Sequence, residues 1–206
     1  MHEGIMRNSS GIVSSDKPVR CHLTVFLGGG IVQAMDTERP KVSAIAAIGK
    51  RRELGKDNKL IWKIPDDLRR LRALTIGHPV IMGRKTFDSI IAYTGKPLSD
   101  RPSIVVSRDA SWSHEGVTAA HTVGDAIAKA HELDSREIFI IGGTQIFEAA
   151  LPQIDKLYLT LIDAEADADS FFPPYESVFT KKVFEESREW GDLRYQWVDL
   201  ERGGSI

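Results

Sequence analysis

The chain has 206 residues, of which 42% are hydrophobic, 27% charged and 8% aromatic, and its formal net charge is −2. This length suits one α/β domain with a substantial core, the composition is that of a soluble globular protein, and the near-neutral charge excludes the basic footprint of a nucleic-acid-binding protein. The one cysteine, Cys21, cannot form an internal disulfide, which favours a reducing, cytoplasmic setting.

Residues 1–40 are predicted to form a poorly ordered N-terminal extension, because they mix Ser, Gly and charged residues with one short apolar run at 21–34. Translation from upstream of a natural start at Met35 is the simpler interpretation of this segment. A secretory signal is the alternative, since the run follows basic residues and ends in small ones. The run is too short and too glycine-rich to span a bilayer, and we expect no membrane association. The folded domain is expected to cover residues 41–203.

Beyond residue 40, short apolar runs alternate with helix-like stretches, as in βα units. The runs are too continuously apolar to leave one face in water, which predicts a central sheet buried on both sides. The last two runs have no helix between them and predict an antiparallel hairpin that ends a mostly parallel sheet. Strands are predicted at 42–48, 79–82, 103–107, 137–141, 156–162, 178–186 and 193–201, and helices at 65–75, 85–91, 123–132 and 144–151.

The first predicted helix carries a carboxylate on its apolar face. At 100° per residue, Asp67 lies on the same side as Leu71 and Leu74. Its neighbour Asp66 is interpreted as a solvated charge that favours the positive end of the helix, which is also the commoner role for a residue such as Asp67. A carboxyl group in an apolar cleft could, however, hold an aminopyrimidine ring by two hydrogen bonds and tune a proton transfer. Asp67 is therefore a candidate catalytic residue.

Two strand-to-helix junctions have features of phosphate sites. At the first, a glycine leads into Arg84, Lys85 and Thr86, so that backbone N–H groups and cations meet at a helix N-terminus. At the second, Gly142 and Gly143 precede a helix, and the absence of a Cβ allows a phosphate to approach the backbone. The alternatives are a hydrated surface turn and a turn that needs glycine for its own geometry.

Two such junctions together suit a dinucleotide, although the glycine spacing of the Rossmann fingerprint is absent. Ser107 and Arg108 follow the strand predicted between the two junctions. With the basic residues of the first junction, they would suit a phosphomonoester such as the 2′-phosphate of NADP.

Seven motifs follow one another over about three quarters of the chain. They are Ile45-Ala-Ala47, Leu54-Gly55, Trp62-x-x-Pro65-x-Asp67-Leu68, Pro79-Val-Ile-Met-Gly-Arg84-x-Thr86-x-x-Ser89-Ile90, Pro97-Leu98-x-x-Arg101, Ile141-Gly142-Gly143 and Tyr158-Leu-Thr160-x-Ile-Asp163. In this order and spacing, the chain resembles bacterial dihydrofolate reductases. The resemblance implies a three-layer α/β fold with an eight-stranded, mostly parallel sheet, an antiparallel C-terminal strand and four helices. It also implies a monomer that reduces 7,8-dihydrofolate to tetrahydrofolate with NADPH, binds antifolates and needs no metal.

The resemblance assigns catalytic roles by position. Asp67 would bind the pterin and assist protonation of N5, with Thr160 hydrogen-bonded behind it and Trp62 ordering a nearby water. Leu60 would lie in a mobile loop whose closure over the nicotinamide excludes bulk water. The family also implies a cis peptide bond between Gly142 and Gly143.

The resemblance further assigns the binding residues, with Arg101 as the clamp of the glutamate α-carboxylate. The substrate-binding residues would be Ile45, Ala47, Asp67, Leu68, Leu71, Ile90, Leu98, Arg101, Ile141 and Thr160. The cofactor-binding residues would be Ala46, Ala47, Leu54, Gly55, Asn58, Gly83, Arg84, Lys85, Thr86, Ser107, Arg108, Ile141, Gly142, Gly143, Thr144, Gln145 and Ile146. For each apolar position the alternative is plain core packing.

Four positions depart from the family pattern: Leu71 replaces the usual phenylalanine, Leu60 a methionine, Phe147 a tyrosine and Thr144 a third small residue. The lost aromatic wall at position 71 removes ring stacking worth about 0.5–1.5 kcal/mol, which predicts weaker antifolate binding. The stretch 91–96 is also longer than in the commonest bacterial forms.

Two other functions compete with this interpretation. A pyrimidinone reductase of riboflavin synthesis resembles the same fold and uses NADPH, but Trp62 together with Asp67 argues against it. A non-catalytic NADP-binding or folate-binding protein is the second alternative. The combination of acid, threonine and arginine in the motifs argues against that class.

Overall fold

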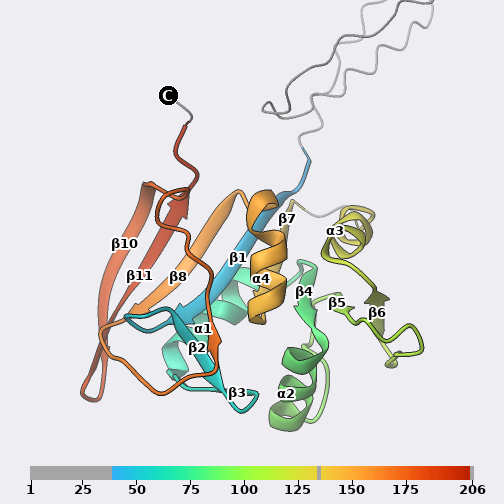
Figure 1. The fold of residues 1–206 in the computed structure, drawn as a ribbon, viewed down its shortest axis with the longest axis horizontal. Coiled ribbons are helices and arrows are strands. Elements are labelled where there is room, and N and C mark those ends of the chain that lie inside the picture. Colours follow the sequence, from blue (N-terminus) through green and yellow to red (C-terminus); the bar gives the residue numbers. More distant parts are fainter. Residues whose placement is uncertain (1–38, 134–135, 205–206) are drawn as a thin grey trace, which may run out of the picture. The chain divides into compact units, whose positions relative to one another are not determined.

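A central eight-stranded sheet organises the protein (Figure 1). The computed structural model describes residues 39–133 and 136–204, so nearly all of the expected N-terminal extension lies outside the described residues. The strands of this sheet are β1 (Lys41–Ile48), β4 (Val80–Gly83), β5 (Ser103–Val106), β6 (Val117–Ala120), β7 (Glu137–Gly142), β8 (Lys156–Ile162), β10 (Lys181–Trp190) and β11 (Leu193–Glu201).

The strand order is β10-β11-β8-β1-β7-β4-β5-β6. Neighbours from β8 to β6 run parallel, whereas β11 is antiparallel to both β8 and β10. The first strand of the sheet therefore lies in its middle, between β8 and β7. The expected mostly parallel sheet with an antiparallel C-terminal strand is confirmed.

Helices cover both faces of the sheet, which gives the three layers expected. In β1, Ala44 and Ile48 join a core cluster with α3 (Val123–His131) and α4 (Thr144–Ala150). Ile45, which points to the opposite face, joins a second cluster with α1 (Pro65–Thr75) and α2 (Arg84–Thr94). This alternation explains why the strands are apolar without interruption. Among the described residues, none of the helices has both the length and the apolar character that a bilayer crossing requires.

The sequence did not predict four short strands. β2 (Glu53–Lys56), β3 (Lys59–Leu60) and β9 (Ser170–Phe171) form a separate three-stranded sheet, and β6 is the fourth. β3 and β9 have only two residues each, and β2 (Glu-Leu-Gly-Lys) and β6 (Val-Thr-Ala-Ala) are not the continuous apolar runs by which the other short strands were found. The two residues between β2 and β3, Asp57 and Asn58, have φ values of 50° and 57°, as a two-residue hairpin turn requires.

Several predicted boundaries are corrected, most of them by one residue. The helix expected at 85–91 is longer and covers Arg84–Thr94. The strand expected at 178–186 is displaced to β10, because Val178 and Phe179 instead donate backbone hydrogen bonds of 3.0 and 2.9 Å to the Tyr175 carbonyl in a turn. The helix expected at 144–151 ends one residue earlier and is followed by a 3-10 turn, η1 (Leu151–Gln153). Proline at position 152 explains this change, since it cannot continue the hydrogen-bonding ladder of an α-helix.

A buried carboxylate fixes the loop between β1 and β2. Glu53 is fully buried and accepts hydrogen bonds from the backbone N–H groups of Arg51 at 2.8 Å and Ala166 at 3.3 Å. A Cβ at Gly49 would lie 2.6 Å from Oε2 of Glu53 and 2.9 Å from the backbone carbonyl oxygen of Ala164, so this position requires glycine. Burial raises the pKa of Glu53, but the backbone hydrogen bonds outweigh burial and hold the pKa below its usual range.

We expect Glu53→Ala to lower the free energy of unfolding by about 1–3 kcal/mol at pH 7, because the N–H groups of Arg51 and Ala166 would lose their acceptor. Urea titration measures this difference. A lowered pKa means that the carboxylate contributes stability above its unfolded value of about 4.3, and that this contribution is lost as the pH falls through the folded value. The gap between wild type and Glu53→Ala should therefore narrow in acid. Glu53→Gln, which keeps one acceptor oxygen, should cost less, and equal stability of all three at pH 7 would contradict the anchoring role.

Candidate active site

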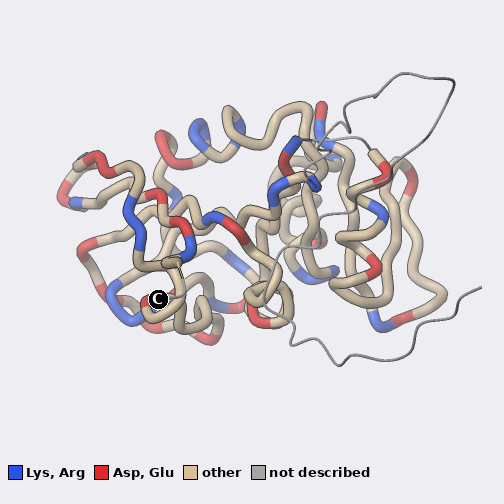
Figure 2. Tube along the Cα trace, turned by 90° about the horizontal axis from the view of Figure 1, so that it is seen from above, with Lys and Arg blue, Asp and Glu red and all other residues tan. Residues whose placement is uncertain are grey.

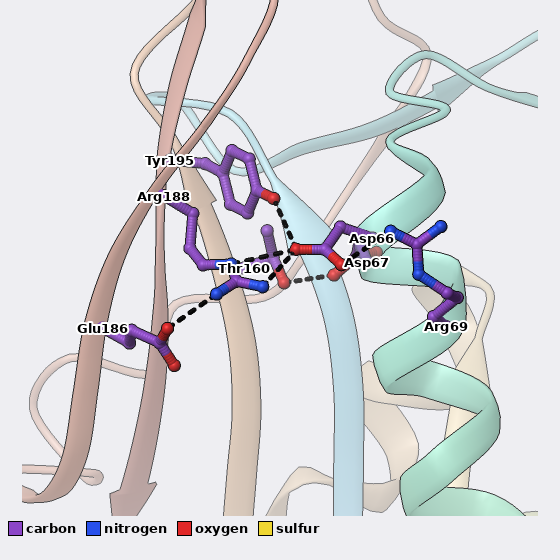
Figure 3. Close-up of polar contacts among 7 residues, drawn as sticks. All are labelled: Asp66, Asp67, Arg69, Thr160, Glu186, Arg188 and Tyr195. Carbon is purple, nitrogen blue, oxygen red and sulfur yellow. Dashed lines mark hydrogen bonds and ion pairs between the residues drawn. The ribbon is translucent and has the colours of Figure 1, made fainter.

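Asp67 lies in the first turn of α1, and its carboxyl group faces β8. The Thr160 hydroxyl of β8 donates a hydrogen bond to Oδ1 of Asp67 (Figure 3). Burial raises the pKa of Asp67, whereas the hydrogen bond from Thr160 and the charge of Arg70 lower it, and burial dominates. A carboxyl group with a raised pKa retains its proton closer to neutral pH and is suited to acid–base chemistry.

Two tryptophans belong to one apolar cluster, and one of them, Trp197, interacts with this carboxyl group. Trp62 and Trp197 pack with Ala47 in one apolar cluster, and the indole nitrogens of both tryptophans are buried. Trp197 of β11 lies directly opposite Thr160 in the sheet. Its N–H lowers the pKa of Asp67, although neither indole nitrogen has a partner with acceptable hydrogen-bond geometry among the described residues. The Trp197 N–H is therefore an available donor near the carboxyl group, and the Trp62 N–H is a second buried donor of the same cluster.

An apolar wall lies between the sheet and the helices α1 and α2. Five of the predicted substrate-binding residues belong to this one cluster: Ile45, Leu71, Ile90, Leu98 and Ile141. Leu68 is half-buried on α1. The sequence assigned these residues to one pocket, and the structure brings five of them together.

Arg101 follows Leu98 in the loop before β5 and is 9% exposed. Its guanidinium donates to the Ser99 carbonyl at 3.0 Å and to Oγ1 of Thr75 at 3.3 Å. Burial and the neighbouring charge of Arg72 lower the pKa of Arg101. No carboxylate of the described residues lies within ion-pairing distance of it, so the charge of this buried cation is available to a ligand.

The strands β7, β4 and β5 end side by side and bring the two phosphate-site candidates together. Met82 pairs with Gly142, and Gly83 pairs with the last residue of β5. The peptide bond between Gly142 and Gly143 is cis, as expected. A Cβ on Gly142 or Gly143 would lie 3.4 or 3.3 Å from Oγ1 of Thr86. The glycines therefore allow this close approach of the two junctions.

Three cations stand near these strand ends. Arg84 and Lys85 begin α2, and Arg108 follows β5 next to the buried Ser107, which accepts a hydrogen bond from the N–H of Asp109 at 3.2 Å. All three cations are exposed, and within residues 39–133 and 136–204 none forms an ion pair. They can offer positive charge to an anion, although the charge of Arg84 also acts on the Asp109 carboxylate.

The remaining predicted cofactor residues lie on three elements. Ala46 is in β1, Leu54 and Gly55 are in β2, Asn58 is in the following turn, and Thr144, Gln145 and Ile146 begin α4. Thr144 joins α4 to the small sheet, because its Oγ1 accepts a hydrogen bond from the N–H of Phe171 at 3.1 Å. Leu60 is in β3 with 52% of its surface exposed and is absent from the cluster around Asp67. The structure thus places Leu60 on the exposed β2–β3 hairpin, paired with Gly55.

The charged residues do not form one large field. Lys and Arg alternate with Asp and Glu along the described chain (Figure 2). A hollow of about 280 Å³ lies at the opposite edge of the sheet, where Lys41 and Lys156 begin their strands. Its charges are largely paired, since Lys156 contacts Asp199 and Asp155 contacts Arg39. The carboxyl ends of the strands are therefore the stronger candidate for a ligand site.

The family model for dihydrofolate reductase matches residues 41–202 of the chain. The chain belongs to the dihydrofolate reductase family. Dihydrofolate reductase type 3 of Salmonella typhimurium is 46% identical over 137 residues, which cover 66% of this chain and 81% of that protein. The dihydrofolate reductase of Haemophilus influenzae is 43% identical over 147 residues, or 71% of this chain and 88% of that protein.

A solved dihydrofolate reductase from Enterococcus faecalis, complexed with NADP(H) and RAB-propyl, superimposes with a TM-score of 0.71. It is 28% identical, and the alignment covers 80% of this chain and 97% of that one. Membership of the dihydrofolate reductase family decides against the pyrimidinone reductase alternative.

The sequence interpretation missed one group of residues near the candidate site. Asp66 was expected to be a solvated charge, yet it is half-buried and accepts hydrogen bonds from Arg188 and Tyr195 as well as from Arg69 (Figure 3). The strand sequence held one indication of this group, because Tyr195 and Trp197 are two residues apart in β11 and therefore lie on the same face of the strand. Nothing in the sequence showed that this face meets α1.

Thr160→Val should raise the pKa of Asp67 further, because the substitution removes the hydroxyl donor that favours the charged carboxylate. The titration of the Asp67 carboxyl carbon, followed by NMR in the ligand-free protein, measures this shift. Thr160→Ser retains the donor and serves as the matched control. If Asp67 had the same titration midpoint in Thr160→Val as in wild type, the hydrogen bond from Thr160 would have no influence on the pKa of Asp67.

Proposed function

We propose that the chain catalyses the NADPH-dependent reduction of 7,8-dihydrofolate to 5,6,7,8-tetrahydrofolate. The observation that carries this proposal is the half-buried Asp67, which is hydrogen-bonded to Thr160 and stands beside an apolar wall that can receive an aromatic ring. The family of the chain and the NADP(H) complex of its structural neighbour agree with this reaction.

In this proposal, the residues of the chain bind the pterin and control one proton. Asp67 accepts hydrogen bonds from the 2-amino group and N3 of the pterin, in the planar geometry that favours a carboxylate. Its raised pKa lets it assist protonation of N5 near neutral pH. Trp62 supplies an N–H that can hold a water next to the acid. When bound, NADPH supplies the hydride that is transferred to C6.

The opposite end of the substrate would be held by Arg101. A buried guanidinium without a carboxylate partner suits two parallel hydrogen bonds to the α-carboxylate of the glutamate moiety. The pterin and p-aminobenzoyl rings would lie along the apolar wall that ends at Leu98. Antifolates would use the same wall, with weaker contact at Leu71, where the family usually has an aromatic ring.

The strand ends of β7, β4 and β5 fit NADPH. Their glycines let a phosphate approach the backbone, and the three unpaired cations Arg84, Lys85 and Arg108 can surround the 2′-phosphate. Thr86 lies against both glycines and would orient the pyrophosphate. Loss of absorbance at 340 nm with dihydrofolate and NADPH tests the proposed reaction, and a non-catalytic binding protein would show none.

Asp67→Asn should lose most of the turnover at neutral pH, because an amide cannot deliver a proton to N5. Turnover should recover partly in acid, where solution protonates the substrate directly. Steady-state kcat between pH 5 and 8 provides the measurement. A variant as active as wild type at pH 8 would remove Asp67 from the mechanism.

The enzyme should prefer NADPH to NADH by about 10²–10⁴ in kcat/KM, because the 2′-phosphate is the group by which the cofactors differ. A hydrogen bond to a charged group contributes about 1.5–3 kcal/mol, each 1.4 kcal/mol is about tenfold, and exposure favours the lower end. The double variant Arg84→Ala, Arg108→Ala should lose most of this preference. A double variant that keeps its full preference would exclude this phosphate site.

A further inference from the structure

Asp66, the residue before Asp67, is held by the C-terminal hairpin. Its Oδ2 accepts hydrogen bonds from Nε and Nη2 of Arg188 at 2.9 and 2.5 Å and from the Tyr195 hydroxyl at 3.3 Å (Figure 3). The two hydrogen bonds from one guanidinium fix the position of Asp66 as well as its charge. They join the start of α1 to β10, the edge strand of the sheet.

Arg188 also contacts the aromatic ring beside Asp67. Its guanidinium carbon lies 4.1 Å from the centre of the Trp197 ring, close enough for a cation–π interaction. Trp197 pairs with Thr160 in the sheet, and Thr160 donates a hydrogen bond to Asp67. Arg188 therefore reaches Asp67 by two routes, one through the adjacent residue in α1 and one through β11 and β8.

We propose that Arg188 is a positioning residue for Asp67. It neutralises the charge of Asp66 and holds the Trp197 ring in place, so that both the charge and the packing beside the Asp67 carboxyl group are fixed. This inference rests on the proposed reduction of dihydrofolate. It assigns part of the chemistry of the site to a hairpin that contributes no residue to the predicted binding sets.

The electrostatic consequence has a definite sign. The charge of Asp66 raises the pKa of Asp67, while hydrogen bonds from Arg188 and Arg69 lower the pKa of Asp66 itself. Removal of Arg188 would leave the negative charge of Asp66 less neutralised and would stabilise the protonated form of Asp67. Asp67 would then retain its proton to a higher pH.

Arg70 also acts on this corner, because its charge lowers the pKa of Asp67 and its guanidinium carbon lies 5.1 Å from the centre of the Trp197 ring, but it is paired with Asp199 and not with Asp66. Arg70 bonds Asp199 at 2.5 Å, and Lys156 bonds the same carboxylate at 3.2 Å. The titratable and charged groups that face this corner from α1, β8, β10 and β11 are Asp66, Arg69, Arg70, Lys156, Glu186, Arg188, Tyr195 and Asp199.

Arg69 provides a matched control within the same cluster. It also bonds Asp66, at 2.9 Å, but its side chain is 73% exposed against 32% for Arg188. None of its contacts with the described residues involves Trp197. Arg69→Met and Arg188→Met each remove one positive charge that is hydrogen-bonded to Asp66. A difference between the Asp67 pKa values of the two variants therefore shows what the placement of Arg188 beside Trp197 contributes.

The experiment compares the full-length variants by two readouts: the pH profile of kcat with dihydrofolate and NADPH, and the NMR titration of Asp67 without ligands. Arg188→Met should move both midpoints upward. For each enzyme, kcat is expressed as a fraction of its own maximum. On the alkaline side of the pH profile, this fraction should be about two- to fivefold larger for Arg188→Met than for wild type. Asp66→Asn should move the midpoints downward, and the double variant Asp66→Asn, Arg188→Met should return them toward wild type.

Arg188→Lys keeps the positive charge and should titrate at the wild-type midpoints. This variant therefore distinguishes the loss of the charge in Arg188→Met from a general folding defect caused by substitution at this position. Equal shifts in Arg69→Met and Arg188→Met, or no shift in either, would overturn the proposal. If Asp67→Asn still loses turnover in that case, the proposed reaction stands and only the role of Arg188 fails. If wild type does not reduce dihydrofolate, the proposed function fails, and the titration without ligands still tests the influence of Arg188 on Asp67.

Discussion

The first strand, β1, is hydrogen-bonded to β7 along one side and to β8 along the other. The register of both neighbouring strands is fixed by pairing with its eight residues. Because of this register, Ala47 lies directly beside Thr160 on β8. On the other side, β7 continues past its last pairing with β1 to reach Gly142 at the edge of the sheet. The proposed acid pocket and the proposed cofactor edge are thus positioned by a single buried strand.

The site also requires a carboxyl group that is partly removed from water without loss of the folded state. Removing a carboxylate from water is costly unless it has hydrogen-bond donors. Asp67 obtains one from Thr160, whereas Glu53 obtains two from backbone N–H groups, those of Arg51 in the adjoining loop and of the distant Ala166. The two residues consequently differ in the direction of their pKa shifts, upward for Asp67 and downward for Glu53. A dry environment therefore serves structure at the fully buried Glu53 and the proposed proton chemistry at the half-buried Asp67.

Much of the fold could be predicted because its signals are local. Continuous apolar runs indicated buried parallel strands, and proline at the start of α1 marked its first turn. The apolar face of that helix singled out Asp67, and the resemblance supplied Thr160 as its partner. The β2–β3 hairpin was missed because its strands are too short for periodicity, although its two turn residues have the conformation that Asp and Asn adopt most readily.

The environment of Asp66 could not be predicted for a different reason. Its partner Arg188 is 122 residues away in the sequence, and a charged residue in a helix first turn has a sufficient local explanation in the helix dipole. Charged residues on an edge strand are likewise expected for solubility alone. Only the packing of the hairpin against α1 shows that each residue has the other as its partner.

The central position of β1 also has a consequence for synthesis on the ribosome. The strand that emerges first must wait for β7 and β8, which begin at residues 137 and 156, before either of its edges can pair. The carboxylates of α1 wait longer still, since their contacts with β8 and β10 span 93 and 122 residues. Such distant pairings slow folding, because the chain loses loop entropy before the contacts form. A nascent chain that stops short of the last hairpin would therefore leave the edge of β8 that pairs with β11 open to chaperones and proteases.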